Sequence, residues 1–157
     1  MAADIMAVAK EPSLFDTAPV EAFMFADGGS RGNPGPAASG SVLLRPDGSD
    51  IAERGAFLGI ATNNVAEWNG LCVGLELAIE HGIKRLAIRM DSELVVKQIT
   101  GVYRVKNEAL QAFYHRAKAL LRKFEYVDVQ HVRRKHNAAA DAVVNQVLDQ
   151  EAFASGK

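Results

Sequence analysis

The segment Phe23–Pro36 constrains the fold of this 157-residue chain more than any other. Apolar residues run from Phe23 into Asp27, four Gly and two Pro follow, and a second apolar run begins at Gly40. Because Gly and Pro break regular structure, the pattern predicts a strand that ends at Asp27, a tight loop and a returning antiparallel strand. An aspartate at the end of a buried strand is costly unless its charge is used. Asp27 is therefore a candidate cation ligand, or else a cap of its own turn.

Length and composition favour a single soluble domain. The chain is 48% hydrophobic, with a formal net charge of −1 and one cysteine, Cys72, which we expect in the core. No apolar run approaches the roughly 18–20 residues of a membrane span, and the N-terminus lacks a secretory pattern. We expect a cytoplasmic monomer that does not contact membranes. Its expected parts are a flexible extension (1–20), a domain (21–150) and a flexible tail (151–157).

Strand and helix patterns follow one another along the chain. The predicted strands are 21–27, 38–45, 51–58, 84–90 and 126–132. The predicted helices are 63–82, 92–99, 107–124 and 138–148. The first three strands read as an antiparallel meander, and the strand–helix–strand run makes the last two strands parallel neighbours.

Three further acids occupy positions where a carboxylate needs an explanation. Glu67 lies on the apolar stripe of its helix, although a capping box with Asn64 would also account for it. Asp91 ends the fourth strand, where Asp91 and Ser92 could instead cap the next helix. Asp141 falls in the first turn of the last helix, which Asn137 is expected to cap, and it could simply complement the helix dipole.

The predicted topology brings the four acids together. Ligands of open α/β sheets gather beyond the carboxyl ends of strands, so Asp27 and Asp91 should stand side by side. Four converging carboxylates repel one another unless a cation is present, and oxygen ligands without Cys select Mg²⁺ or Mn²⁺. Two such ions are the recurring device of phosphodiester hydrolysis. A structural calcium site is the rival, but no EF-hand spacing is present.

Four segments resemble the catalytic segments of type 1 ribonuclease H. They are Phe25–Ala37 around Asp27, Thr62–Glu67, Met90–Ile99 after the fourth strand, and Asn137–Asp141. The resemblance covers about residues 21–149. It implies the ribonuclease H-like fold, a five-stranded mixed sheet of order 3-2-1-4-5 with helices on both faces. It also implies an endonuclease that cuts the RNA strand of RNA/DNA hybrids and leaves 5′-phosphate and 3′-hydroxyl ends. Two Mg²⁺ ions, for which Mn²⁺ can substitute, would be held by Asp27, Glu67, Asp91 and Asp141.

The same resemblance implies a set of substrate contacts. Backbone groups of the glycine-rich loop and three asparagines would read 2′-hydroxyls across the minor groove, which distinguishes RNA from DNA. These positions are Gly28, Gly29, Ser30, Asn33, Asn63 and Asn64. The other implied contacts are Arg31, Ser92, Arg133, Lys135 and Asn137.

Two features depart from the longer bacterial members of this family. Their basic, Trp-rich insertion is missing, because Gly101–Asn107 leads directly into the next helix. The chain resembles the short form found in archaea and some bacteria. Their mobile histidine before the last aspartate also lacks a clear equivalent, since we expect His131 in strand five. Arg134 is the favoured replacement, and His136 is the other candidate.

Positive charge gathers in the second half of the chain. Residues 101–136 contain nine Lys or Arg against three acids. We expect Arg133–Lys135 to contact phosphates, whereas Arg116, Lys118, Arg122 and Lys123 could equally form a solvated helix face. Two other functions remain open: a hybrid-binding module that does not cleave, and another nuclease or transposase of the same fold. The second would need DNA-binding domains for which 157 residues leave no room.

Overall fold

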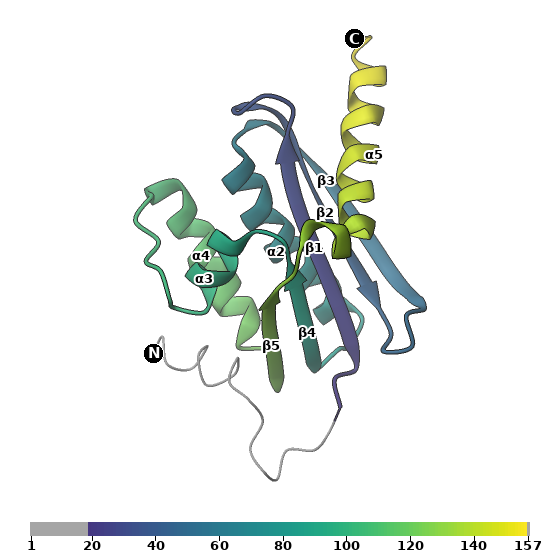
Figure 1. The fold of residues 1–157 in the computed structure, drawn as a ribbon, viewed down its shortest axis with the longest axis vertical. Coiled ribbons are helices and arrows are strands. Elements are labelled where there is room, and N and C mark those ends of the chain that lie inside the picture. The colour runs from purple at the N-terminus through teal and green to yellow at the C-terminus, as the bar shows by residue number, and fades with distance from the viewer. Residues whose placement is uncertain (1–18, 157) are drawn as a thin grey trace.

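The computed structural model describes residues 19–156 and shows one five-stranded mixed sheet in the order β3-β2-β1-β4-β5 (Figure 1). The strands are β1 (Ala22–Ser30), β2 (Gly35–Leu44), β3 (Asp50–Ala61), β4 (Arg85–Met90) and β5 (Tyr126–His131). The helices are α2 (Asn63–Glu80), α3 (Glu93–Ile99), α4 (Glu108–Leu121) and α5 (Ala138–Ala154), with a 3-10 turn at Arg134–His136. The predicted strand order is confirmed.

The central strand β1 has two different neighbours. It pairs antiparallel with β2, where Asp27 lies opposite Gly40, and parallel with β4 only as far as Ala26 opposite Met90. From Asp27 onward, β1 therefore has a strand on one side only. That open edge lies where the chain leaves β4 at Asp91, so the topology places the two aspartates at the same end of neighbouring strands.

Several predicted element ends were wrong by three or more residues: β2 begins at Gly35 and not at 38, β3 ends at Ala61 and not at 58, and α4 ends at Leu121 and not at 124. The first strand and the last helix also end later than predicted. The first strand does not stop at Asp27, because Gly28, Gly29 and Ser30 continue the ladder opposite Ser39, Ala38 and Ala37. The loop is shortened to residues 31–34 and is closed by a bond from Arg31 N to Pro36 O of 2.9 Å. The last helix ends at Ala154 rather than Leu148, so 151–154 are helical. Most of the predicted extension, residues 1–18, lies outside the described residues.

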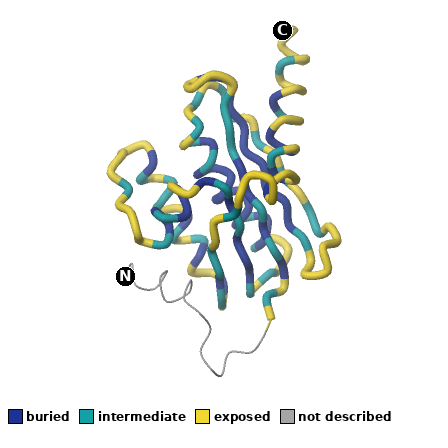
Figure 2. The backbone as a smooth tube through the Cα atoms, viewed as in Figure 1, coloured by how far each residue is buried: buried dark blue, intermediate teal, exposed yellow. Residues whose placement is uncertain are grey.

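In the part of the chain that the structure describes, three helices cover one face of the sheet, and one helix covers the other. The helices α2, α3 and α4 pack on one face over the main core, which contains the fully buried Trp68, Met24 and Leu75. Cys72 is also in this core, as predicted, and burial raises the pKa of its thiol to about 12. On the other face α5 lies alone, over two small apolar clusters that include Val143 and Val144. Figure 2 shows the buried central strands between these layers.

Close backbone approach fixes α2 and α5 against the middle of the sheet. A Cβ atom on Gly28 would stand 2.1 Å from the carbonyl carbon of Ala66 in α2. On the opposite face, a Cβ on Gly40 would stand 2.8 Å from Ala140 O in α5. Real Cβ atoms do not tolerate such distances, so both contacts require glycine. The first turns of both helices are thereby held beside Asp27.

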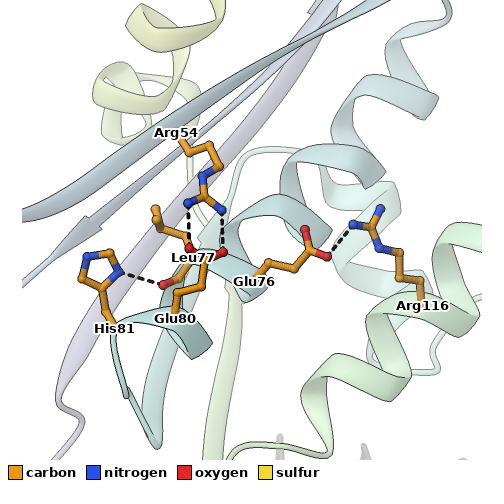
Figure 3. A network of polar contacts seen from close by, with 6 residues as sticks. All are labelled: Arg54, Glu76, Leu77, Glu80, His81 and Arg116. Carbon is orange, nitrogen blue, oxygen red and sulfur yellow. Dashed lines mark hydrogen bonds and ion pairs between the residues drawn. The ribbon is translucent and has the colours of Figure 1, made fainter.

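Ion pairs tie the outer side of α2 to its neighbours (Figure 3). Arg54 of β3 binds both carboxylate oxygens of Glu80 at 2.8 and 2.9 Å, and Arg116 of α4 binds Glu76 at 2.6 Å. Arg116 therefore serves the packing of α4 on α2 and is not a free cation. Within residues 19–156, no helix combines the length and the apolar character that crossing a bilayer requires.

Candidate active site

The pairing between β1 and β4 ends with Ala26 opposite Met90, and Asp27 and Asp91 are the next residues of the two strands. Asp27 is 7% exposed, and its Oδ1 accepts a hydrogen bond of 2.8 Å from Gly28 N. Asn137 joins the two strand ends, since its Nδ2 donates to Ala26 O at 2.9 Å and to Asp91 Oδ1 at 3.2 Å. The parallel pairing thus places both carboxylates at one edge of the sheet, as the sequence predicted.

Asn137 does not act as the predicted helix cap. It occupies the N-cap position of α5, but its side chain makes no capping bond and instead reaches the sheet. The side chain is buried, at 1% exposed, and within the described part of the chain its Oδ1 has no hydrogen-bond partner. A buried amide oxygen without a donor is costly. The atom is therefore available to accept a bond from water or a ligand at this edge.

Glu67 belongs to the site and not to a capping box. The N-cap of α2 is Thr62, whose hydroxyl accepts a bond of 3.2 Å from Val65 N, so the capping box with Asn64 was wrong. The Glu67 carboxylate instead lies close enough to Asp91 and Ser92 for both to affect its pKa. Ser92 caps α3, since its Oγ accepts a bond from Val95 N at 3.3 Å. The cap of α3 therefore lies beside the Glu67 carboxylate.

Asp141 enters the site from the opposite face of the sheet. It lies in the first turn of α5, where its N donates to Asn137 O at 3.1 Å. Asn145, one turn later, donates from Nδ2 to Asp141 Oδ2 at 3.2 Å. Asn145 was not among the residues predicted for the site, although its spacing of four residues from Asp141 places the two side chains on one helix face and could have indicated it.

Asp27 and Glu67 have pKa values raised well above the usual range of a carboxyl group. Burial, followed by the charge of Asp91, raises the pKa of Asp27 to about 8, and Asp141 adds to the shift by charge and by a hydrogen bond. Burial and Asp91 also raise the pKa of Glu67 to about 7, against the opposing effects of Ser92 and Arg134. The acids therefore interact as one electrostatic group, and protonation is favoured unless positive charge is supplied.

The donor chemistry of this group fits a hard divalent cation. Four carboxylates and a buried amide oxygen, with no sulfur among them, match the preference of Mg²⁺ and Mn²⁺. Within residues 19–156, however, no three His, Cys, Asp or Glu side chains form an arrangement ready to hold a metal ion. The effect of Asp91 on the pKa values of both Asp27 and Glu67 nevertheless indicates that these three acids lie near one another.

The predicted minor-groove contacts lie at the open edge of β1. Asn63 Oδ1 accepts bonds from Ser30 N at 2.9 Å and from Ser30 Oγ at 3.1 Å. Asn33 Oδ1 accepts a bond from Asn63 N at 3.1 Å, so the loop and the start of α2 are fixed to each other. Asn33, Asn63 and Asn64 also line one cavity of about 390 Å³. The structure thus brings these three asparagines together, and Asn63 connects them to Ser30 at the end of β1.

The basic residues before Asn137 form an exposed 3-10 turn and not the predicted loop. Arg134 is 89% exposed, and its Nε lies 3.7 Å from Asp91 Oδ2. Arg133, Lys135 and His136 are exposed in the same turn, and none of them has a described contact with the four acids. His131 ends β5, as predicted. Arg134 is therefore the member of this turn that reaches the site.

Sequence comparison relates the chain to known proteins. A family model described as reverse transcriptase-like matches residues 25–147. Ribonuclease HI of Halobacterium salinarum is 46% identical over 123 residues, which are 78% of this chain and 62% of that protein. The bifunctional protein Rv2228c of Mycobacterium tuberculosis is 45% identical over 125 residues, which are 79% of this chain and 34% of that protein. The chain spans less than two thirds of the length of these relatives.

Solved structures resemble most of the chain. The crystal structure of the Halobacterium RNase H1 has a TM-score of 0.80 at 43% identity, and the match covers 82% of this chain and 98% of the Halobacterium chain. The N-terminal RNase H domain of Rv2228c has a TM-score of 0.83 at 42% identity, and the match covers 87% of this chain and 99% of that domain. LC11-RNase H1, crystallised in complex with an RNA/DNA hybrid, has a TM-score of 0.79 at 36% identity, and the match covers 83% of this chain and 98% of the LC11 chain.

Proposed function

Since this chain belongs to the ribonuclease HI family and has its ribonuclease H-like fold, we propose that it hydrolyses the RNA strand of RNA/DNA hybrids. The products are 5′-phosphate and 3′-hydroxyl ends. The observation that carries the proposal is the meeting of Asp27 and Asp91 at one sheet edge, with Glu67 and Asp141 delivered from opposite faces. The hybrid in the complex of LC11-RNase H1 supports the choice of substrate.

Divalent metal is the cofactor that this group of acids fits. Asp27, Glu67, Asp91 and Asp141 are the residues that would hold two Mg²⁺ ions, with Mn²⁺ as a substitute. When bound, such ions supply activation of the attacking water and stabilisation of charge at the scissile phosphate. The protein contributes orientation, since Asn137 donates a hydrogen bond to Asp91 Oδ1.

Arg134 is proposed to act on the substrate and not on the metal. Its side chain is exposed beside Asp91, where a guanidinium can bind an incoming phosphate or assist the departure of the product. Among the described contacts, His136 in the same turn has none with the four acids. The neighbouring Arg133 and Lys135 are exposed cations that would contact backbone phosphates.

Recognition of RNA is assigned to the open edge of β1. The backbone of Gly28, Gly29 and Ser30 has no β4 partner there, and Ser30 bonds Asn63, which lines a cavity together with Asn33 and Asn64. Amide groups at this edge can donate to and accept from 2′-hydroxyls, which DNA lacks. Arg31, Ser92 and Asn137 complete the proposed contact set. Such contacts do not read base edges, so no sequence preference follows.

A single cleavage assay tests the proposal. Labelled RNA/DNA, RNA/RNA and DNA/DNA duplexes are incubated with and without Mg²⁺, and only the RNA strand of the hybrid should be cut, and only with metal. Asp91→Asn keeps the shape of the side chain and removes its charge, so cleavage should fall by about 100-fold or more. Glu151→Gln removes an exposed charge from α5 and serves as the control.

The alternative of a hybrid-binding module predicts a different outcome. The wild-type chain would then bind the hybrid but leave it intact in Mg²⁺ and in Mn²⁺. The presence of all four acids favours catalysis over this alternative. Cleavage by Asp91→Asn to within about tenfold of wild type would remove the basis of the metal-dependent mechanism.

A further inference from the structure

A chain of polar contacts outside the four acids links the loop 31–34 to Asp141. Asn145 donates from Nδ2 to Asp141 Oδ2 at 3.2 Å and to Asp141 O at 3.1 Å. Arg31 donates from Nη2 to Asn145 Oδ1 at 3.5 Å and to Asp149 Oδ1 at 2.7 Å. Three of these four residues lie on α5 at intervals of four, so they share one face of the helix.

The amide of Asn145 suits the task of holding a carboxylate that must bind a cation. A hydrogen bond to Oδ2 restricts rotation of the Asp141 side chain and leaves Oδ1 without this partner. Because the amide is neutral, it does not cancel the charge that attracts metal, as a lysine or arginine would. The second bond, to Asp141 O, anchors the amide to the backbone of the same turn.

Arg31 adds to the preference for the orientation in which the amide NH₂ group faces the two acceptor oxygens of Asp141. The oxygen and nitrogen of an asparagine amide have nearly the same shape, so their placement depends on the partners. A guanidinium only donates, and it therefore binds the oxygen and leaves the NH₂ group for the carboxylate. The contact of 3.5 Å is long, but the ion pair of 2.7 Å with Asp149 keeps the guanidinium beside Asn145.

We propose that Asn145 is a positioning residue for Asp141, and that the ion pair of Arg31 and Asp149 favours this orientation of its amide. This inference rests on the proposed function, in which Asp141 holds metal. It also connects the loop that carries Asn33 to the metal site across the open end of β1. The exposed ion pair adds little to stability, about 0–1 kcal/mol, so positioning and stability can be measured separately.

The test compares Asn145→Ala with the control Gln146→Ala, the next exposed residue of α5. Mn²⁺ binding to the full chain is measured by calorimetry without substrate, and hybrid cleavage is measured as kcat and KM. We expect Asn145→Ala to lose about 10-fold in metal affinity and in kcat, with KM and the metal-free Tm nearly unchanged. Gln146→Ala should match wild type in all four quantities.

A double-mutant cycle tests the part played by Arg31. If Arg31 acts through Asn145, Arg31→Ala should weaken metal binding in the wild-type background but not further in Asn145→Ala. Additive losses would overturn this step. The substrate contact proposed for Arg31 would appear separately in KM.

The outcomes separate this inference from the proposed function. Equal Mn²⁺ affinities of Asn145→Ala and wild type overturn the positioning role, whether or not the hybrid is cut. A metal affinity that depends on Asn145 in a protein that leaves hybrids intact supports positioning and overturns the function. A wild-type chain that binds no Mn²⁺ overturns both.

Discussion

Asp27 is a buried carboxyl group whose ionisation opposes folding. Burial and Asp91 raise its pKa from 3.8 to about 8. A carboxyl group with a raised folded-state pKa contributes to stability fully below about pH 4, and this contribution is lost as pH rises to about 8. The asparagine of Asp27→Asn cannot ionise. Between pH 4 and pH 8 the free energy of unfolding should therefore fall less in this variant than in wild type, and the difference between the two falls should be on the order of 1–3 kcal/mol.

Urea unfolding at pH 4, 6 and 8 with a chelator present measures this difference. Glu67→Gln should behave in the same way over a window that ends near pH 7, where its own raised pKa lies. Parallel pH curves for Asp27→Asn and wild type would mean that Asp27 is ionised in the folded protein at low cost.

Arg134 and His136 lie in the same exposed turn and can be compared directly. Arg134→Ala should lower kcat by about 10-fold or more, because a cation that meets the phosphate is lost. Its Mn²⁺ affinity should stay within about twofold of wild type, since the exposed contact of 3.7 Å with Asp91 is weak. Turnover and calorimetry measure both, and a larger loss of kcat in His136→Ala would show that histidine has the role.

The four acids were predictable from the sequence, but their partners were not. An acid at a strand end or on an apolar stripe stands out because burial of charge is costly. Asn137 has good capping chemistry, and only the fold reveals that its amide bonds Ala26 O and Asp91 instead. Side-chain hydrogen bonds between distant segments depend on packing that local patterns do not encode.

At the scale of elements, the approach of α2 to β1 depends on Gly28. Gly28→Ala would place a Cβ atom 2.1 Å from the Ala66 carbonyl carbon, so α2 must move and Glu67 with it. We expect a loss of about 2–3 kcal/mol in the free energy of unfolding. Gly29→Ala is the matched control, because its Cβ would meet only Val144 Cγ1 at 3.9 Å. Urea unfolding of both variants measures the difference, and similar losses would contradict the close-packing argument.

The sequence predicted the kind and order of the elements better than their ends. The glycines after Asp27 predict that the strand ends there, yet Gly28–Ser30 remain paired with β2. Cross-strand hydrogen bonds overrode the local preference of glycine for turns. The last helix was ended at Leu148, although Asp149–Ala154 continue it with no glycine or proline to stop them.

At the scale of the molecule, the two faces of the sheet are stabilised to different extents. One face carries the main core under α2, α3 and α4, whereas α5 rests on small clusters such as Ala38, Val144 and Leu148. Figure 1 shows α5 continuing past the sheet, and Phe153 near its end is 88% exposed. Backbone amides of α5 should therefore exchange with deuterium faster than those of α2. Equal protection of the two helices would contradict this expectation.

The position of α5, alone on its face of the sheet, has a thermodynamic consequence because the helix carries Asp141. A cation shared by Asp27 and Asp141 would join this helix to the central strand, so cation binding and local folding become linked equilibria. Cation binding would then stabilise the docked helix, and docking of the helix would raise the affinity for the cation. Warming or mild denaturant would raise the metal concentration needed for half-saturation before the sheet unfolds, and saturating metal would slow the exchange of α5 selectively. Catalytic competence would then be lost by detachment of a single helix, well below the temperature at which the rest of the protein melts.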